Sequence, residues 1–136
     1  MMGNPRPLPE ADNGAAAFWE GARRGELLVQ RCDDCGNHQH YARPFCVACR
    51  GRRLTMVPVG GRGVLHSFTV VHRAPFDDLP APYVVALVRL QEGPTILSHL
   101  VGCDPAAARC DMPVRVDFQP LRDGVMLPVF RSADGA

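Results

Sequence analysis

The chain has 136 residues, of which 46% are hydrophobic and 21% charged, a balance typical of a globular protein and not of a disordered tail. Its 15 basic residues are all arginine, which excludes lysine Schiff-base chemistry, and 14 acidic residues leave a formal charge of +1. No apolar run approaches the roughly 20 residues that cross a membrane, and no signal peptide is recognisable. We therefore expect a cytoplasmic protein with one domain or two very small ones.

Residues 1–24 are expected to form a tail and a docking helix. Met1 to Pro9 is rich in proline and is expected to be loose. Asp12 or Asn13 can cap a helix from Ala15 to Arg24, and Gly25 is a helix stop signal.

Phe18 and Trp19 are the two aromatic residues of this helix. Adjacent residues point about 100° apart on a helix, so one ring can face this chain while the other faces outward. The only Trp of the chain is therefore either a packing anchor or an interface anchor.

The cysteine spacing is the most informative pattern in the sequence. Four cysteines form two Cys-x2-Cys knuckles separated by ten residues, and they are Cys32, Cys35, Cys46 and Cys49. Two facing knuckles complete a tetrahedron around zinc, and four thiolates leave no position open for water. The segment from residue 25 to 60 is too small for a self-sufficient core, so the zinc is expected to be structural.

The knuckle spacing has two other interpretations. A disulfide framework is disfavoured because no secretion signal is recognisable, and iron in a rubredoxin-like site is the alternative to zinc. Gly36 and Gly51 are expected to supply the positive φ that each knuckle turn needs. Cys103 and Cys110 fit no common zinc motif and are interpreted as small, partly buried thiols.

Short strands are expected on both sides of the knuckles. The ribbon strands should span residues 26–31, 38–43 and 54–59. After the Gly-rich junction 60–63, five strands are expected at 64–73, 83–90, 95–101, 114–119 and 125–131, with a short helix at 105–109. Five strands with a helix between the third and fourth are the layout of an OB fold. The fold class is thus mainly β, with a rubredoxin-like ribbon at 25–60 and an OB-fold barrel at 61–136.

No motif for catalysis stands out. The chain has no GxSxG elbow and no complete phosphate loop, and His66 and His72, which share a predicted strand face, have no evident partner for acid–base work. Two classes of function remain. One is single-stranded nucleic-acid binding, which the near-zero charge and the absence of lysine disfavour. The other is an accessory module that docks on a protein partner and covers a small-molecule site.

The sequence resembles the zinc-ribbon/OB-fold proteins associated with acyl-CoA metabolism, a family once labelled domain of unknown function 35. The resemblance covers about residues 14–131 and is carried by segments that include Phe18-Trp19-Glu20-Gly21, Gln30-Arg31-Cys32, Cys35-Gly36, Gly61-Arg62-Gly63, Ser67 to Arg73, Pro82 to Val88 and Leu127 to Phe130.

The resemblance implies a non-catalytic subunit of a thiolase-like acyltransferase or carbon–carbon lyase, with a hydratase-like chain as the alternative partner. Thiolysis, condensation, retro-aldol cleavage or C-acyl transfer would take place on that partner. Phe18 and Trp19 would bind the partner, and a CoA thioester would lie at the shared interface. The candidate ligand-binding residues, chosen for a CoA phosphate or its neighbourhood, are Arg62, His72, Arg73, Tyr83 and Arg89.

Overall fold

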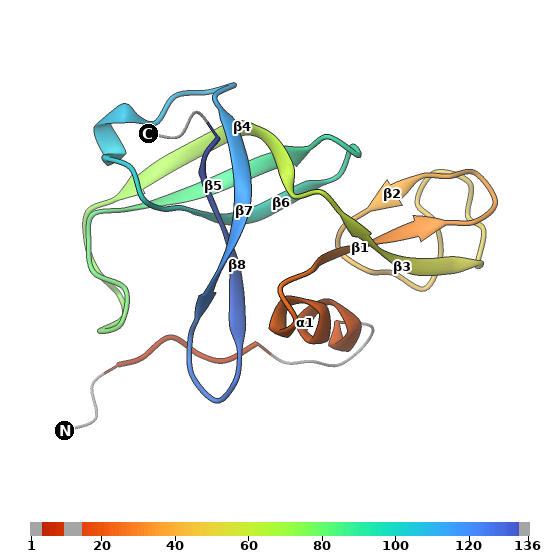
Figure 1. The fold of residues 1–136 in the computed structure, drawn as a ribbon, viewed down its shortest axis with the longest axis horizontal. Coiled ribbons are helices and arrows are strands. Elements are labelled where there is room, and N and C mark those ends of the chain that lie inside the picture. The colour runs from red at the N-terminus through yellow and green to blue at the C-terminus, as the bar shows by residue number, and fades with distance from the viewer. Residues whose placement is uncertain (1–3, 10–14, 134–136) are drawn as a thin grey trace.

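The computed structural model describes residues 4–9 and 15–133. One helix, α1 (Ala16–Arg23), precedes a three-stranded ribbon sheet and a closed five-stranded barrel. The ribbon extends from one end of the barrel, and α1 lies at their junction (Figure 1). The predicted fold class, mainly β with a zinc ribbon followed by an OB-type barrel, is confirmed.

Helix α1 is shorter than expected at both ends. Ala15 is its N-cap residue and makes no side-chain cap, while Asp12 and Asn13 lie outside the described residues. Gly25 ends the helix as predicted, with a φ of 80° and an N–H that donates to the Ala22 carbonyl. A Cβ on Gly21 would lie 2.6 Å from the Leu28 side chain, so the absence of a side chain at Gly21 lets the helix approach the ribbon closely.

The ribbon sheet has the strand order β2-β1-β3, and all its pairs are antiparallel. Its strands are β1 (Leu27–Cys32), β2 (His38–Gln39) and β3 (Leu54–Val59). The return strand is much shorter than the predicted 38–43. Beyond Gln39, the backbone of Arg43 bonds to the side-chain amide of Gln30 and not to the neighbouring strand.

The barrel closes in the order β4-β5-β6-β8-β7. Its strands are β4 (Arg62–Val71), β5 (Tyr83–Leu90), β6 (Thr95–Leu100), β7 (Pro113–Pro120) and β8 (Met126–Ser132). The short helix between β6 and β7 is a single 3₁₀ turn, Pro105–Ala107, capped by the Asp104 carboxylate, which accepts from the N–H of Ala106 at 2.9 Å. Five strands are therefore found where five were predicted, within about two residues at each end.

A β-bulge in β4 changes the expected orientation of one histidine. The register with β5 shifts between Leu65 and Ser67, so Leu65 and Phe68 both pack into the core. The extra residue is His66, which is exposed. Strict alternation predicts that His66 and His72 share a face; the bulge interrupts that alternation, and His72 lies one residue beyond the end of β4.

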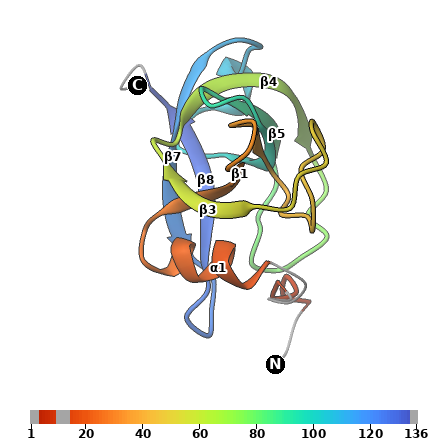
Figure 2. The same ribbon diagram turned by 90° about the vertical axis from the view of Figure 1, so that its right-hand side faces the viewer.

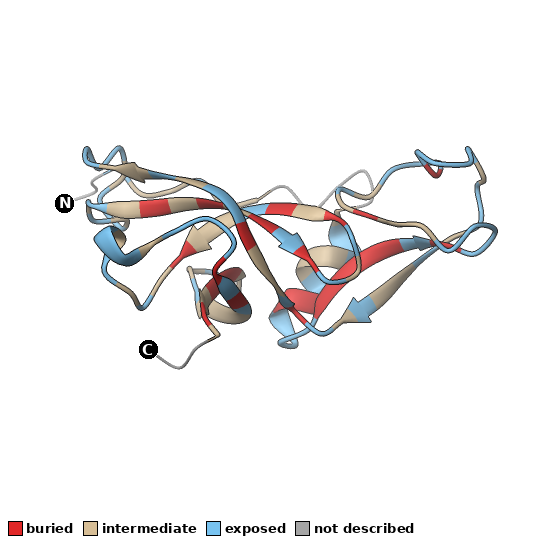
Figure 3. Ribbon diagram, turned by 90° about the horizontal axis from the view of Figure 1, so that it is seen from above, coloured by how far each residue is buried: buried red, intermediate tan, exposed pale blue. Residues whose placement is uncertain are grey.

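The ribbon and the barrel share one hydrophobic core. Leu27 and Val29 of β1 belong to the same buried cluster as Leu65, Val88 and Phe130 of the barrel. Buried positions run along β1 from the barrel into the ribbon and become sparse toward the ribbon's far end (Figure 3). The boundary between a ribbon at 25–60 and a barrel at 61–136 remains a prediction, and the two units are not independent in packing.

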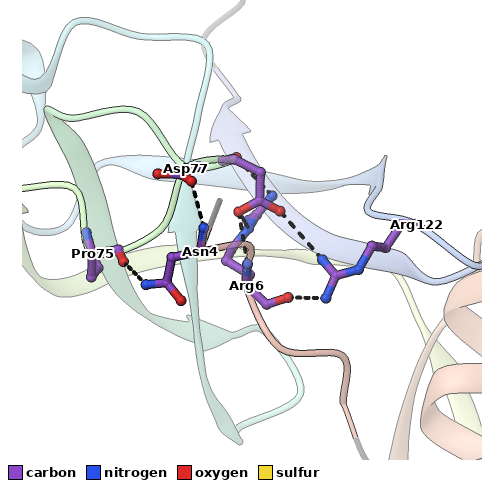
Figure 4. A network of polar contacts seen from close by, with 6 residues as sticks. Asn4, Arg6, Pro75, Asp77 and Arg122 are labelled. Atoms are coloured by element: carbon purple, nitrogen blue, oxygen red, sulfur yellow. Dashed lines mark hydrogen bonds and ion pairs between the residues drawn. The ribbon is translucent and has the colours of Figure 1, made fainter. Parts of the chain in front are cut away.

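Within the described residues 4–9, the N-terminal segment is hydrogen-bonded to the barrel and its loops, contrary to the expectation of a loose tail. Asn4 donates to the Asp77 carboxylate and to the Pro75 carbonyl, both at 2.6 Å. Arg6 pairs with Asp78, and Arg122 donates to the Arg6 carbonyl (Figure 4). The composition indicated a proline-rich segment, but it could not show that Asn4 and Arg6 form hydrogen bonds with the loop before β5.

Candidate metal centre and docking groove

The four knuckle cysteines converge at the far end of the ribbon. Their Sγ atoms all lie within 4.8 Å of one another, and the pairs Cys32–Cys49 and Cys35–Cys46 are each 3.6 Å apart. A tetrahedral zinc with Zn–S bonds of about 2.3 Å has S–S edges of about 3.8 Å. The sulfur positions therefore fit one zinc ion bound by all four predicted ligands.

The two knuckles have the same backbone pattern. The N–H of Gly36 donates to the Cys32 carbonyl, and that of Arg50 to the Cys46 carbonyl, both at 2.8 Å. The positive φ falls on Gly36 (78°) and Arg50 (66°). The prediction that Gly51 has a positive φ was wrong, because the turn needs the positive φ at the residue directly after the second cysteine of the knuckle, which is Arg50.

Gly51 has a different structural requirement. A Cβ at this position would lie 2.6 Å from the Asp34 carboxylate and 3.2 Å from the Cys49 sulfur. The glycine is therefore needed for close approach to the metal centre, not for an unusual φ.

Backbone N–H groups donate hydrogen bonds to two of the four sulfurs. The N–H of Ala48 donates to Cys46 at 3.4 Å, and that of Gly51 donates to Cys49 at 3.3 Å. Backbone N–H donation, first from Cys49 and then from Ala48, lowers the pKa of Cys46 to about 6. Bound here, zinc would supply a cross-link between the two knuckles, since four sulfurs leave no position for a water or substrate.

Two buried glutamines hold the loop between the knuckles, and sequence reasoning missed both. Gln39 donates to Gln30 at 2.6 Å and to the Phe45 carbonyl at 3.1 Å, and accepts from the N–H of Val47 at 3.0 Å. Gln30 bonds both the N–H and the carbonyl of Arg43 at 2.9 Å. The two side chains replace strand pairing as the partners of this backbone.

A cavity of about 650 Å³ opens where α1, the ribbon and the barrel meet. Figure 2 shows α1 crossing below β3, and the helix also contacts β8. We call this cavity the docking groove. It is lined by Phe18 and Trp19 of α1, by residues 40–42 of the ribbon loop, and by outward-facing residues of β5, β6 and β8 that include Val85, Leu97, His99, Leu127 and Val129.

The docking groove is apolar and uncharged. Among the described residues, no Asp, Glu, Lys, Arg or Cys lines it. Burial lowers the pKa of His40 to about 4, and burial, followed by the charge of Arg6, lowers that of His99, so both imidazoles are neutral near pH 7. Tyr41 and Leu97 are each 58% exposed, so two large hydrophobic side chains face solvent at the rim of the groove.

The aromatic rings of α1 join the helix to the ribbon loop. Phe18 packs edge-on against Trp19 with ring centroids 5.0 Å apart, and lies 5.1 Å from the ring of His40. Phe18 also packs against the shared core, and both aromatic residues are half-buried. The prediction that they bind a partner stays a prediction, but both lie on the surface where such a partner would fit.

The five candidate ligand-binding residues fall into two groups. Arg62 and Arg89 lie near the ribbon end of the β4–β5 hairpin, where Val64 pairs with Arg89. Tyr83 pairs with Val71 at the opposite end of the same hairpin, just before His72 and Arg73. At about 3.3 Å per residue the two groups are about 20 Å apart, so one small ligand group cannot contact all five.

The remaining cysteines do not join the metal centre. Cys103 packs against the core, and burial, reinforced by the charge of Asp104, raises the pKa of its thiol. Cys110 is exposed. Among residues 4–9 and 15–133, no helix combines the length and apolarity that a bilayer crossing requires.

Comparison with known proteins gives two family models that together span most of the chain. Residues 19–55 match the rubredoxin-like zinc ribbon domain of ChsH2, and residues 56–119 match the C-terminal OB-fold domain of ChsH2. The models meet inside β3, which agrees with the continuous core described above.

Curated relatives carry the names of enzyme subunits. A protein from Thermomonospora curvata named a probable enoyl-CoA hydratase alpha subunit is 38% identical over 95% of this chain, which spans only 40% of that relative. A benzoylsuccinyl-CoA thiolase subunit, BbsA, from Geobacter metallireducens is 30% identical over 71% of this chain and 64% of its own length. A solved structure titled Ltp2-ChsH2(DUF35) aldolase matches with a TM-score of 0.84 and 37% identity over 94% of this chain and 99% of that one.

Proposed function

The chain belongs to the DUF35 family of zinc-ribbon and OB-fold proteins, and on that premise we propose that it is a non-catalytic accessory subunit of a thiolase-like acyltransferase or carbon–carbon lyase. In this role it binds the catalytic chain and shapes the acyl and CoA channel. The names of two relatives support the proposal, because one is a thiolase subunit and the other was solved as part of an aldolase.

The docking groove is the observation that carries the proposal. The groove of about 650 Å³ has mainly apolar lining residues, with exposed Tyr41 and Leu97 at its rim, and contiguous apolar surface of this kind marks interaction sites. Apolar side chains of a catalytic partner would fill it, with Trp19 as the central anchor. Aromatic residues in such pockets commonly dominate binding energy.

The metal centre would act on this groove indirectly. The loop 40–42 forms one of its walls, and the backbone that follows it is bonded by Gln30 and Gln39. Zinc fixes the knuckles on either side of this loop, so the metal sets the shape of the surface that the partner meets.

A CoA thioester at the shared interface is part of the same proposal. Tyr83 packs edge-on against His99, a groove residue, with ring centroids 5.4 Å apart. The end of β4 and β5 that carries His72, Arg73 and Tyr83 therefore adjoins the groove. We assign the phosphate groups of the CoA thioester to this end, where an arginine side chain can donate hydrogen bonds to phosphate oxygens.

Substitution of Trp19 tests the docking role. Trp19→Ala should weaken the complex with the thiolase-like chain by at least about 2 kcal/mol, measured by titration calorimetry, because the substitution removes the aromatic wall of the groove. Arg23→Ala is the matched control on the exposed side of α1, where Arg23 pairs with Glu20, and it should change affinity little. Equal affinity of wild type and Trp19→Ala would exclude Trp19 as the anchor.

The hydratase-like partner is a second candidate, favoured by the relative named as a hydratase alpha subunit. Co-expression with a thiolase-like chain and, separately, with a hydratase-like chain distinguishes the two. The partner that co-elutes at a fixed ratio identifies the complex.

A further inference from the structure

Three arginines lie in direct register across three adjacent strands of the barrel. Arg62 of β4 pairs with Arg115 of β7, and Arg115 pairs in turn with Arg131 of β8. These strands are neighbours in the closed barrel (Figure 1). Directly opposite residues have Cβ atoms about 4.5–5.5 Å apart, so the three side chains form one basic row.

This row faces outward. The alternate positions Val114 and Phe130 on the same strands are buried in the core, which places Arg115 and Arg131 on the outer surface. Arg89 of β5 lies opposite Val64, two residues along β4 from Arg62, and so extends the row onto a fourth strand. We call Arg62, Arg89, Arg115 and Arg131 the arginine row.

Internal acids neutralise little of this charge. Asp117 pairs with Arg131 at 2.6 Å, and that hydrogen bond is the main reason why the pKa of Asp117 is lowered. Within the described residues, no hydrogen bond or ion pair engages the side chains of Arg62 and Arg89. The row with Asp117 thus carries about +3, whereas the whole chain has a formal charge of +1.

Like charges directly opposite on neighbouring strands are destabilising, so this arrangement opposes folding of the isolated chain. An anionic surface placed over the row would remove that repulsion. The position of the four arginines on the barrel exterior is therefore better explained by a bound partner than by the stability of the free chain.

The shape and composition of this face indicate the kind of anion. None of the four arginines lines a cavity described above, whereas small ligands bind in concave sites. The outward positions beside the row, Val64 and Pro113, are not aromatic, and single-stranded nucleic acids need aromatic rings for base stacking. A basic outer sheet face whose flanking positions Val64 and Pro113 are not aromatic fits a protein surface rich in carboxylates.

We infer that the arginine row is a second docking surface, which binds an acidic surface of the catalytic subunit and steers its association. The inference rests on the proposed function, since it assumes that partner. It adds an electrostatic contact on β4, β5, β7 and β8, whose arginines do not line the apolar docking groove. Charge complementarity of this kind accelerates encounter and makes association depend on salt.

Association kinetics test the inference. The thiolase-like chain is immobilised, and binding of wild type, R62E/R115E and R62K/R115K is followed by surface plasmon resonance in 50 mM and 500 mM NaCl. At low salt the charge-reversed variant should associate at least about tenfold more slowly than wild type, and the lysine variant should stay within about threefold. At high salt the three rates should converge, because screening removes the steering.

Each outcome has a defined meaning. If wild type binds and R62E/R115E associates equally fast at low salt, the arginine row is not a docking surface and the proposed function stands. If wild type does not bind the thiolase-like chain at all, the docking-surface inference and the proposed function both fail. If wild type binds a 20-nucleotide single-stranded oligonucleotide with steep salt dependence and R62E/R115E does not, the row is a nucleic-acid surface and the inference is overturned.

Discussion

The barrel and the knuckle end of the ribbon are stabilised in different ways. The barrel buries large apolar side chains such as Leu65, Val88 and Phe130 completely. In the knuckle end, residues 32–53, the only buried side chains are Cys32, Gln39 and Cys46. One region is thus held by apolar burial, and the other by four metal-binding sulfurs and a pair of amides.

The comparison shows why both regions occur in one short chain. Burial stabilises at roughly 25 cal/mol per Å², which is insufficient where almost every side chain is exposed. Zinc bound by the four cysteines would replace the missing core and leave the surface of the knuckle end free for contacts. Strand β1 joins the two, since Leu27 and Val29 belong to the shared core and Cys32 belongs to the cluster of four cysteines.

Removal of the metal should separate the two regions most clearly. Zinc contributes about 10–16 kcal/mol in small finger peptides, so chelation should unfold residues 32–53 while the barrel stays folded. Hydrogen exchange measured by mass spectrometry should show fast exchange in the knuckle end and continued protection of β5 and β6. Unchanged protection of residues 32–53 after complete zinc removal would contradict this account.

Cys110→Ser is the control for this experiment. Cys110 is exposed and lies outside the cluster, so the variant should keep one zinc per chain and wild-type exchange. Cys46→Ser should lose the bound zinc, and residues 32–53 of that variant should exchange fast.

Truncation of the barrel core is the converse test. Phe130 is fully buried, and Phe130→Ala should destabilise the barrel by about 3–5 kcal/mol in urea unfolding because it leaves a large cavity. Leu97→Ala, at a side chain that is 58% exposed, should cost far less. A loss below about 1 kcal/mol for Phe130→Ala would mean that the barrel does not depend on this core.

The buried glutamines should give the smallest of the three effects. Gln39→Leu leaves the N–H of Val47 and the carbonyl of Phe45 without their partner, which should cost about 1–3 kcal/mol and loosen the groove wall. Thr55→Ala is an exposed polar control in the same ribbon, where the Thr55 hydroxyl donates to the Asp33 carboxylate, and it should be nearly neutral. Equal stability of the two variants would show that the amide pair is dispensable.

Patterns local in the sequence predicted most of the fold. The Cys-x2-Cys spacing located the metal ligands, and alternation along β7, with Val114, Val116 and Phe118 inward, located that strand. Gly25 marked the end of α1. Each of these sequence patterns depends on residues within a few positions of one another, so these features could be predicted without knowing which distant residues contact them.

What the sequence did not show depends on distant contacts. Gln30 and Gln39 look like ordinary polar strand residues until their amides meet across the ribbon. The bonds of Asn4 and Arg6 join residues more than 70 positions apart in the chain. The arginine row needs the β4–β7–β8 register, which a one-residue bulge can change.

Reconstitution of activity tests the central claim most directly. Turnover of an acyl-CoA thioester is measured with the thiolase-like chain alone, with this chain alone and with both together. The account predicts that this chain alone has no activity, that the mixture has full activity, and that Trp19→Ala reduces the mixture's rate at limiting concentrations of this chain. Turnover by this chain alone, or equal turnover by the thiolase-like chain with and without it, would contradict the account.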